Sequence, residues 1–156
     1  IHYEHLVAVN DPNNPDSLAL TRGELWLGLL LKAESPQLFH PHIEGVTILE
    51  RSTTLLIREV DFGNMRVRER IELREEESLA HDTEPGANHA GGKLQVLIEE
   101  PTEGNLFVRF SYETPTPQDP EAEQLVDYLK EMWRQMDVES IRKIRELAES
   151  GQLKRH

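Results

Sequence analysis

An unbroken succession of strand-like segments, followed by one long amphipathic helix, most limits how this chain can fold. Across residues 45–113, apolar and polar residues alternate, and short turn-forming stretches separate the alternating runs. In the clearest run, 65–74, Val67 and Ile71 share one side while Arg68 points to the other. Neighbouring side chains of a strand point to opposite faces, so the pattern predicts strands with one buried face. Strands joined by short turns form antiparallel meanders.

About six strands are expected in this region, and one more precedes them. Gly63 and Asn64 predict a tight turn, and the segment 83–92, which contains Gly, Asn and Pro, predicts a loop. We interpret the segment 76–81 as an edge strand. The expected strands are 1–9, 46–50, 55–62, 65–74, 76–81, 94–98 and 106–112.

A capping box predicts the start of a helix ahead of the main run of strands. Thr21 can accept a hydrogen bond from the amide of Glu24, whose carboxylate can reach back to the amide of Thr21. The helix should run to about Glu34 and end before Pro36, because the residue before a proline is disfavoured in a helix. The segment 36–39 is expected to add one short turn.

The C-terminal segment predicts a helix of about thirty residues, which at ~1.5 Å per residue would be ~45 Å long. Asp119 is a suitable N-cap and Pro120 a suitable first helical residue, while Gly151 is placed to end the helix after Ser150. Asp137 could recap the chain and bend the helix at that point. A sheet with one apolar face must be covered, and this helix is the only element large enough to cover it.

Two helical motifs carry a resemblance to a known family. The segment 20–39, LTRGELWLGLLLKAESPQLF, resembles the first helices of the AtaL-like family, formerly a domain of unknown function. The segment 136–148, MDVESIRKIRELA, resembles the C-terminal motif of that family. The strand residues that resemble it are Arg58-Glu59-Val60, Phe62-Gly63, Phe110 and Tyr112-Glu113.

The resemblance covers essentially the whole chain and implies a fold. The family belongs to the SRPBCC, or START-like, superfamily, which includes proteins similar to the birch-pollen allergen. It implies an α+β helix-grip fold in a single domain over 1–156. In this fold a curved antiparallel sheet of about six or seven strands wraps around a long C-terminal helix, and short helices follow the first strand. The resemblance also implies an interior pocket, but it carries over no catalytic residue.

Charge and composition exclude several classes of partner. Lys and Arg number 17 against 29 Asp and Glu, which gives a net charge of −12. Proteins bind nucleic acids and anionic lipid surfaces mainly through patches of Lys and Arg, so neither is expected as a partner of this acidic chain. The chain has no cysteine, which excludes disulfide and thiolate chemistry. The longest apolar run, 25–31, is far shorter than the roughly 20 residues that span a bilayer. A cytoplasmic location is expected, and no cofactor is expected.

Two polar side chains stand on the apolar side of predicted strands. Glu69 lies between Val67 and Ile71, and His5 lies on the inward side of the first strand. A buried carboxylate needs a partner or takes up a proton, so Glu69 could bind a ligand hydroxyl or act as a general acid or base. The structural alternatives are a bulge or an arginine pair for Glu69, and a satisfied core histidine for His5.

Several large side chains are expected to line any cavity between the sheet and the helix, because aromatic rings and methionines suit irregular apolar ligands. Ordinary core packing remains the commoner role for any one of them. The candidates on the long helix are Tyr128, Met132, Trp133 and Met136. The others are Trp26, Phe110 and Tyr112. His40-Pro41-His42 lacks a third ligand at a useful spacing, so no metal site is predicted.

These patterns favour a binding protein for a small hydrophobic or aromatic metabolite. One alternative is an enzyme similar to polyketide cyclases and aromatases, which would use a carboxylate, a histidine or a tyrosine in the cavity for proton transfer. Another is a protein-interaction module, which would present an exposed apolar patch instead of a cavity. A homodimer is compatible with all three.

Overall fold

Seven strands and two α-helices form the described part of the chain. The computed structural model describes residues 1–14, 16–87, 89–118 and 120–153. The helices are α1 (Arg22–Glu34), the 3₁₀-helix η1 (Pro36–Leu38) and α2 (Ala122–Glu149). The strands are β1 (His2–Ala8), β2 (Gly45–Arg51), β3 (Leu55–Asp61), β4 (Arg66–Arg74), β5 (Ser78–Thr83), β6 (Gly92–Glu99) and β7 (Phe107–Glu113).

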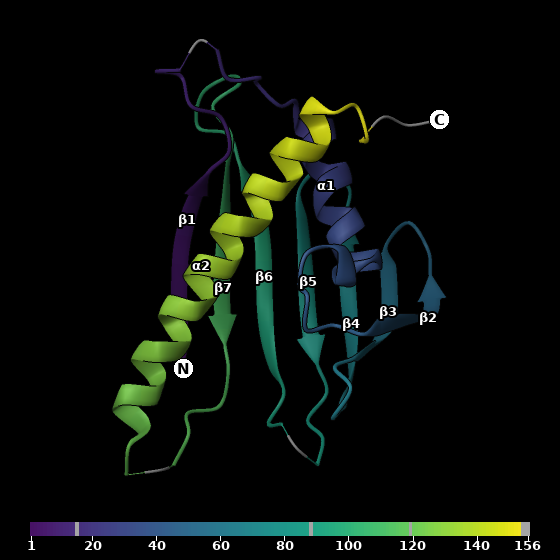
Figure 1. Ribbon diagram of the computed structural model, residues 1–156, viewed down its shortest axis with the longest axis vertical. Helices are drawn as coiled ribbons and strands as arrows, with labels where there is room; N and C mark the ends of the chain where they lie inside the picture. Colours follow the sequence, from purple (N-terminus) through teal and green to yellow (C-terminus); the bar gives the residue numbers. More distant parts are fainter. Residues whose placement is uncertain (15, 88, 119, 154–156) are drawn as a thin grey trace.

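The strands make one antiparallel sheet in the order β1-β7-β6-β5-β4-β3-β2. Helix α2 runs diagonally across one face of this sheet, and its C-terminal end lies beside α1 (Figure 1). The chain therefore has the α+β helix-grip fold that the resemblance implied. No helix in the described ranges is long and apolar enough to cross a membrane.

The strand register places the apolar side chains on the face that carries the helices. Val7 lies opposite Val108 in the pairing of β1 with β7, and Ile98 lies opposite Val108 in the pairing of β6 with β7. These residues and their neighbours form one buried cluster with α1 and the C-terminal half of α2. The opposite face is polar, as the alternation predicted.

The segment expected to be an edge strand lies inside the sheet. It forms β5, which is hydrogen-bonded to both β4 and β6, whereas the edges are β1 and β2. Glu76 has a φ of 59° in the turn before it, so the strand begins two residues later than expected. The start of β5 is buried at Ser78 and Leu79, but the polar residues around these two positions conceal that burial in the sequence.

The local signals at the start of the chain are confirmed. The amide of Glu24 donates to Thr21 Oγ1 at 3.1 Å, and the amide of Thr21 donates to Glu24 Oε1 at 2.9 Å. The helix ends at Glu34 and is followed by the expected short turn, which is η1.

The long helix differs from expectation at its start and in its middle. It begins at Ala122, so Pro120 is not its first residue, and the expected N-cap Asp119 lies outside the described residues. It continues through Asp137 without interruption, so Asp137 does not recap the chain. Its carboxylate instead bonds to side chains of the sheet, as described below. Gly151, with a φ of 76°, follows the end of the helix as predicted.

The two helices approach each other closely at one glycine. A Cβ atom built on Gly28 would lie 2.4 Å from Ile144 Cγ2, well inside van der Waals contact. Ile144 is fully buried, so it has little room to move. Gly28 therefore sets the distance between α1 and α2.

We expect Gly28→Ala to destabilise the protein, as measured by urea unfolding. Overpacking a core lowers the free energy of unfolding by about 1–3 kcal/mol. The higher helix propensity of alanine offsets this loss by at most about 1 kcal/mol. Gly23→Ala in the same helix is the control, because the nearest atom to its added Cβ is a glutamate oxygen at 3.4 Å. If both variants are as stable as the wild type, the close approach of the helices is not a packing constraint.

Candidate ligand-binding cavity

A cavity of about 810 Å³ lies between the inner face of the sheet and the helices. Its walls come from the end of α1, the segment 36–43, strands β3 to β7, and residues 132–139 of α2. Most of the lining is apolar, and the cavity is partly open to solvent. Its size lies within the range of about 300–1,000 Å³ that is typical of small-molecule sites.

The cavity brings together most of the residues that the sequence singled out. Six of the nine candidate ligand-binding residues line it: Glu69, Phe110, Tyr112, Met132, Trp133 and Met136.

Three candidates lie elsewhere. Tyr128 is 65% exposed on α2, because nine residues of helix turn it roughly 180° away from the buried Asp137. Trp26 is packed in the core at 3% exposure. His5 lies beside the cavity, where its ring stacks on Phe110 with centroids 5.4 Å apart.

Stacked aromatic rings form one wall of the cavity. The rings of Tyr112 and Trp133 are nearly parallel, with an interplanar angle of 2° and centroids 4.4 Å apart. Tyr3 lies 6.3 Å from Trp133 and 6.2 Å from Tyr112. Tyr112 and Trp133 line the cavity, and the contacts among the three rings hold this apolar wall in place.

Glu69, on β4, is an ionised carboxylate held by side chains of the two neighbouring strands, β3 and β5. Arg58 on β3 donates to Glu69 Oε1 from Nη2 at 2.7 Å and from Nε at 3.2 Å. On β5, His81 Nδ1 lies 2.7 Å from the same oxygen, and the Thr83 hydroxyl donates to Oε2 at 2.7 Å. Burial alone would raise the pKa of Glu69, but the charges of His81 and Arg58 and these hydrogen bonds hold it well below its usual range.

A second buried carboxylate, Asp137, connects α2 to the sheet. The Tyr112 hydroxyl lies 2.7 Å from Asp137 Oδ2 and 2.9 Å from Oδ1, and His5 Nε2 lies 2.7 Å from Oδ2. Burial and the charge of Asp137 raise the pKa of Tyr112 far above its usual value, so its hydroxyl keeps its proton and donates. Sequence analysis missed this role, although Asp137 stands four residues from both Trp133 and Ile141 on the apolar stripe.

Lys32 is another cavity residue that sequence analysis missed. It lies on the buried side of α1, three residues after Leu29, and its Nζ lies 5.9 Å from the centre of the Phe110 ring. Burial lowers the pKa of Lys32, and this effect exceeds the opposing influence of Asp137. Burial and the nearby Lys32 also lower the pKa of His40 to about 4, so this imidazole is uncharged at neutral pH.

The part of the chain that the structure describes contains no group of three or more His, Asp or Glu side chains placed to hold a metal ion. His40 and His42 both line the cavity.

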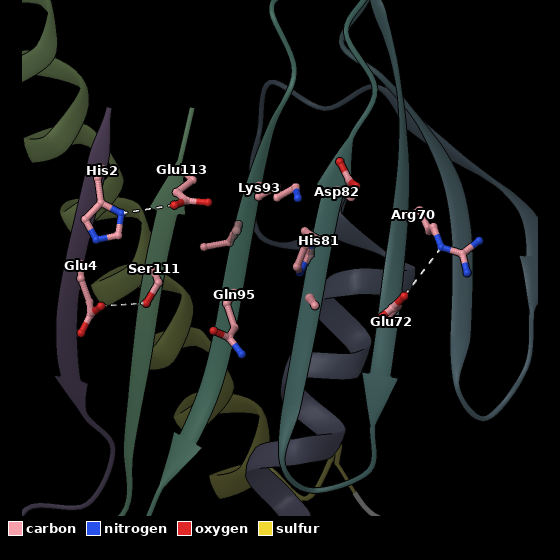
Figure 2. Close-up of a pocket in the computed structure, with 12 residues that line it drawn as sticks. His2, Glu4, Arg70, Glu72, His81, Asp82, Lys93, Gln95, Ser111 and Glu113 are labelled. Atoms are coloured by element: carbon pink, nitrogen blue, oxygen red, sulfur yellow. Dashed lines mark hydrogen bonds and ion pairs between the residues drawn. The ribbon is translucent and has the colours of Figure 1, made fainter. Parts of the chain in front are cut away.

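A second depression, of about 540 Å³, lies on the opposite face of the sheet. Figure 2 views this face, with the helices behind the strands. The labelled side chains are polar or charged, and the pairs His2–Glu113 and Arg70–Glu72 are 3.9 and 4.0 Å apart. Exposed pairs of this kind contribute little, and the surface around them is solvated. The apolar cavity on the inner face is therefore the candidate site.

The AtaL family model, described as acetylaranotin biosynthesis cluster protein L, matches residues 7–151. The chain matches no curated protein sequence significantly.

Several solved structures are similar to this fold. The Zhui aromatase/cyclase from Streptomyces sp. R1128 has a TM-score of 0.65 and 15% identity, over 94% of each chain. The di-domain ARO/CYC StfQ from the steffimycin biosynthetic pathway has a TM-score of 0.69 and 11% identity, over 96% of this chain and 50% of that one. A START superfamily protein from Mycobacterium smegmatis has a TM-score of 0.58 and 12% identity, over 92% and 98%. At these identities the similarity shows the fold alone.

We expect Tyr112→Phe to lower the free energy of unfolding by about 1–3 kcal/mol, because it removes a hydroxyl that donates to a buried carboxylate. Tyr128→Phe is the matched control. Its ring is exposed, so we expect a change within about 0.5 kcal/mol. Urea unfolding of both variants measures the difference, and equal stabilities would contradict the anchoring role of Tyr112.

We expect Glu69→Gln to cost about 3 kcal/mol or more at neutral pH, since it leaves the Arg58 guanidinium buried without its counter-charge. Because the folded pKa of Glu69 is depressed from 4.5, its stabilisation is present above about pH 4.5 and is lost as the pH falls. The stability difference from wild type should therefore narrow towards about pH 3. Glu72→Gln, on the solvated face of the same strand, is the control. A difference that stays constant with pH would contradict an ionised, paired Glu69.

Proposed function

Because the chain belongs to the AtaL family, we propose that it binds a small hydrophobic or aromatic metabolite in the cavity between the sheet and α2. The observation that carries this proposal is an apolar cavity of about 810 Å³ with a wall of stacked aromatic rings. The solid core of an ordinary domain contains few voids larger than a water molecule, so a hollow of this size needs a reason. Occupation by a ligand supplies one.

Six of the lining residues have roles in the proposed complex. The stacked rings of Trp133 and Tyr112 provide an apolar surface against which an aromatic ligand can pack. Met132 and Met136 border the same space and adapt to irregular shapes. Phe110 contributes its ring from the neighbouring part of β7, and Glu69 contributes an acceptor for a ligand hydroxyl.

A second candidate function is catalysis of the cyclase or aromatase kind. Two titratable clusters meet the cavity, one around Glu69 and one around Asp137 and Tyr112. Such groups can orient a substrate and transfer protons. The similarity in fold to the Zhui aromatase/cyclase and to StfQ also supports this second candidate function.

A protein-interaction module is the third candidate function. A module of this kind is expected to present an exposed apolar patch instead of a cavity. The hollow interior therefore favours a small molecule over a protein as the partner.

Fluorescence titration with phenylnaphthylamine, a neutral aromatic probe, tests the binding proposal. Val67→Trp places a large side chain into the cavity, so we expect its affinity for the probe to fall about tenfold or more. Arg68→Trp adds the same side chain to the solvated face of β4 and should bind as the wild type does. Thermal unfolding curves check that both variants are folded. If both are folded and bind the probe with equal affinity, binding in this cavity is contradicted.

Native mass spectrometry of protein isolated from its own host separates binding from catalysis. A bound metabolite whose mass is unchanged after incubation supports binding alone. A change in the mass of that metabolite during incubation supports the enzyme instead.

A further inference from the structure

We infer that the natural ligand carries an acidic oxygen group, such as a carboxylate or an enolate, and that Lys32 is the residue that binds it. This inference rests on the proposed function and names the chemical class of its ligand.

Lys32 presents its ammonium to the interior of the cavity. It projects from the last turns of α1, and its nitrogen lies 5.9 Å from the centre of the Phe110 ring on the opposite wall. The surface that Lys32 retains faces the cavity, since the residue is one of its lining groups. A ligand that contacts the Phe110 ring inside the cavity would therefore lie close to this nitrogen.

Lys32 is a basic side chain of the cavity to which the structure gives no ion-pair partner. Within the described residues, no carboxylate lies within 4.0 Å of its Nζ, and no acceptor receives a hydrogen bond from it. The contact with the Phe110 ring is a cation–π interaction near the limit of its range. An ammonium ion is costly to bury without a partner.

The two buried carboxylates of the cavity already have hydrogen-bond partners. Arg58 binds Glu69, and its Nη1 also donates to the carbonyl of Ala33 at 2.6 Å. Asp137 lies between Tyr112 and His5. The charges of Asp137 and Glu69 favour the charged form of Lys32, but neither carboxylate forms an ion pair with it within 4.0 Å. A ligand anion would supply that direct partner.

A pair of probes with one shared skeleton tests this inference. Phenylnaphthylamine is neutral, whereas anilinonaphthalene sulfonate carries the same rings and an added anionic group. We expect wild-type protein to prefer the sulfonate. Lys32→Met should weaken sulfonate binding about tenfold or more and leave phenylnaphthylamine affinity within about twofold, because a hydrogen-bonded ion pair contributes to the anion alone.

Lys93→Met is the matched control. Lys93 lines the depression on the outer face (Figure 2), so this variant also reveals binding of the anionic probe at that surface. It should leave both affinities unchanged. If Lys32→Met leaves the sulfonate affinity unchanged, or weakens both probes equally, the inference is wrong. Failure of wild-type protein to bind either probe would instead overturn the proposed function on which the inference rests.

Thermal unfolding of the ligand-free protein distinguishes ligand binding from a structural role of Lys32. A lysine nitrogen buried without a partner destabilises the empty protein, so Lys32→Met should raise its Tm by about 2–4 °C. A Tm that falls in this variant would show that Lys32 supports the fold and would count against a binding role.

Discussion

The contacts of Tyr112 and His5 with Asp137 mark the place where α2 stops packing on the sheet and begins to cover a cavity. On the C-terminal side of Asp137, Ile141 and Ile144 are buried against the core. Towards the N-terminus, Met132 and Trp133 border open space instead. The close approach at Gly28 fixes the packed end of the helix against α1. With that end held and the middle attached to β7 and β1, the sheet and the helix cannot close completely.

The electrostatics of the cavity follow from the same arrangement. Both of its buried carboxylates are held by side chains from neighbouring strands, as a low-dielectric interior requires. Glu69 binds Arg58 across the directly paired strands β3 and β4, whereas Asp137 binds across the boundary between helix and sheet. Lys32 remains without such a partner. Under the inference above, the interior combines an apolar volume with a lysine that has no ion-pair partner among the described residues, and this combination favours an aromatic or apolar molecule that carries an acid.

Most of the fold could be predicted from the sequence, because local signals and the overall architecture agree. Strand alternation, the capping box at Thr21 and the terminal Gly151 all indicated elements that the structure contains. The start of α2 at Ala122 and its continuation through Asp137 differed from expectation. So did β5, whose few apolar residues are surrounded by polar ones that concealed its central position. Its burial comes from its neighbours in the sheet, which periodicity within one segment does not reveal.

The site was harder to predict, since it depends on which residues of distant elements meet. Glu69 was found because it interrupts the apolar side of a strand. Asp137 and Lys32 interrupt the apolar sides of helices in the same way, but Asp137 was interpreted as a residue that recaps the chain and bends the helix. Tyr128 stands nine residues before Asp137, so the two side chains point to roughly opposite sides of α2. An apolar stripe read along a long helix therefore does not keep to one side over the whole length of the helix.

A crystal structure of the protein with bound phenylnaphthylamine would test the central claim most directly. The cavity predicts electron density for the two aromatic groups between α2 and the inner face of the sheet, in contact with Trp133 and Phe110. Density for the probe only on the outer face, or an interior filled by repacked side chains, would contradict a ligand-binding cavity in this protein.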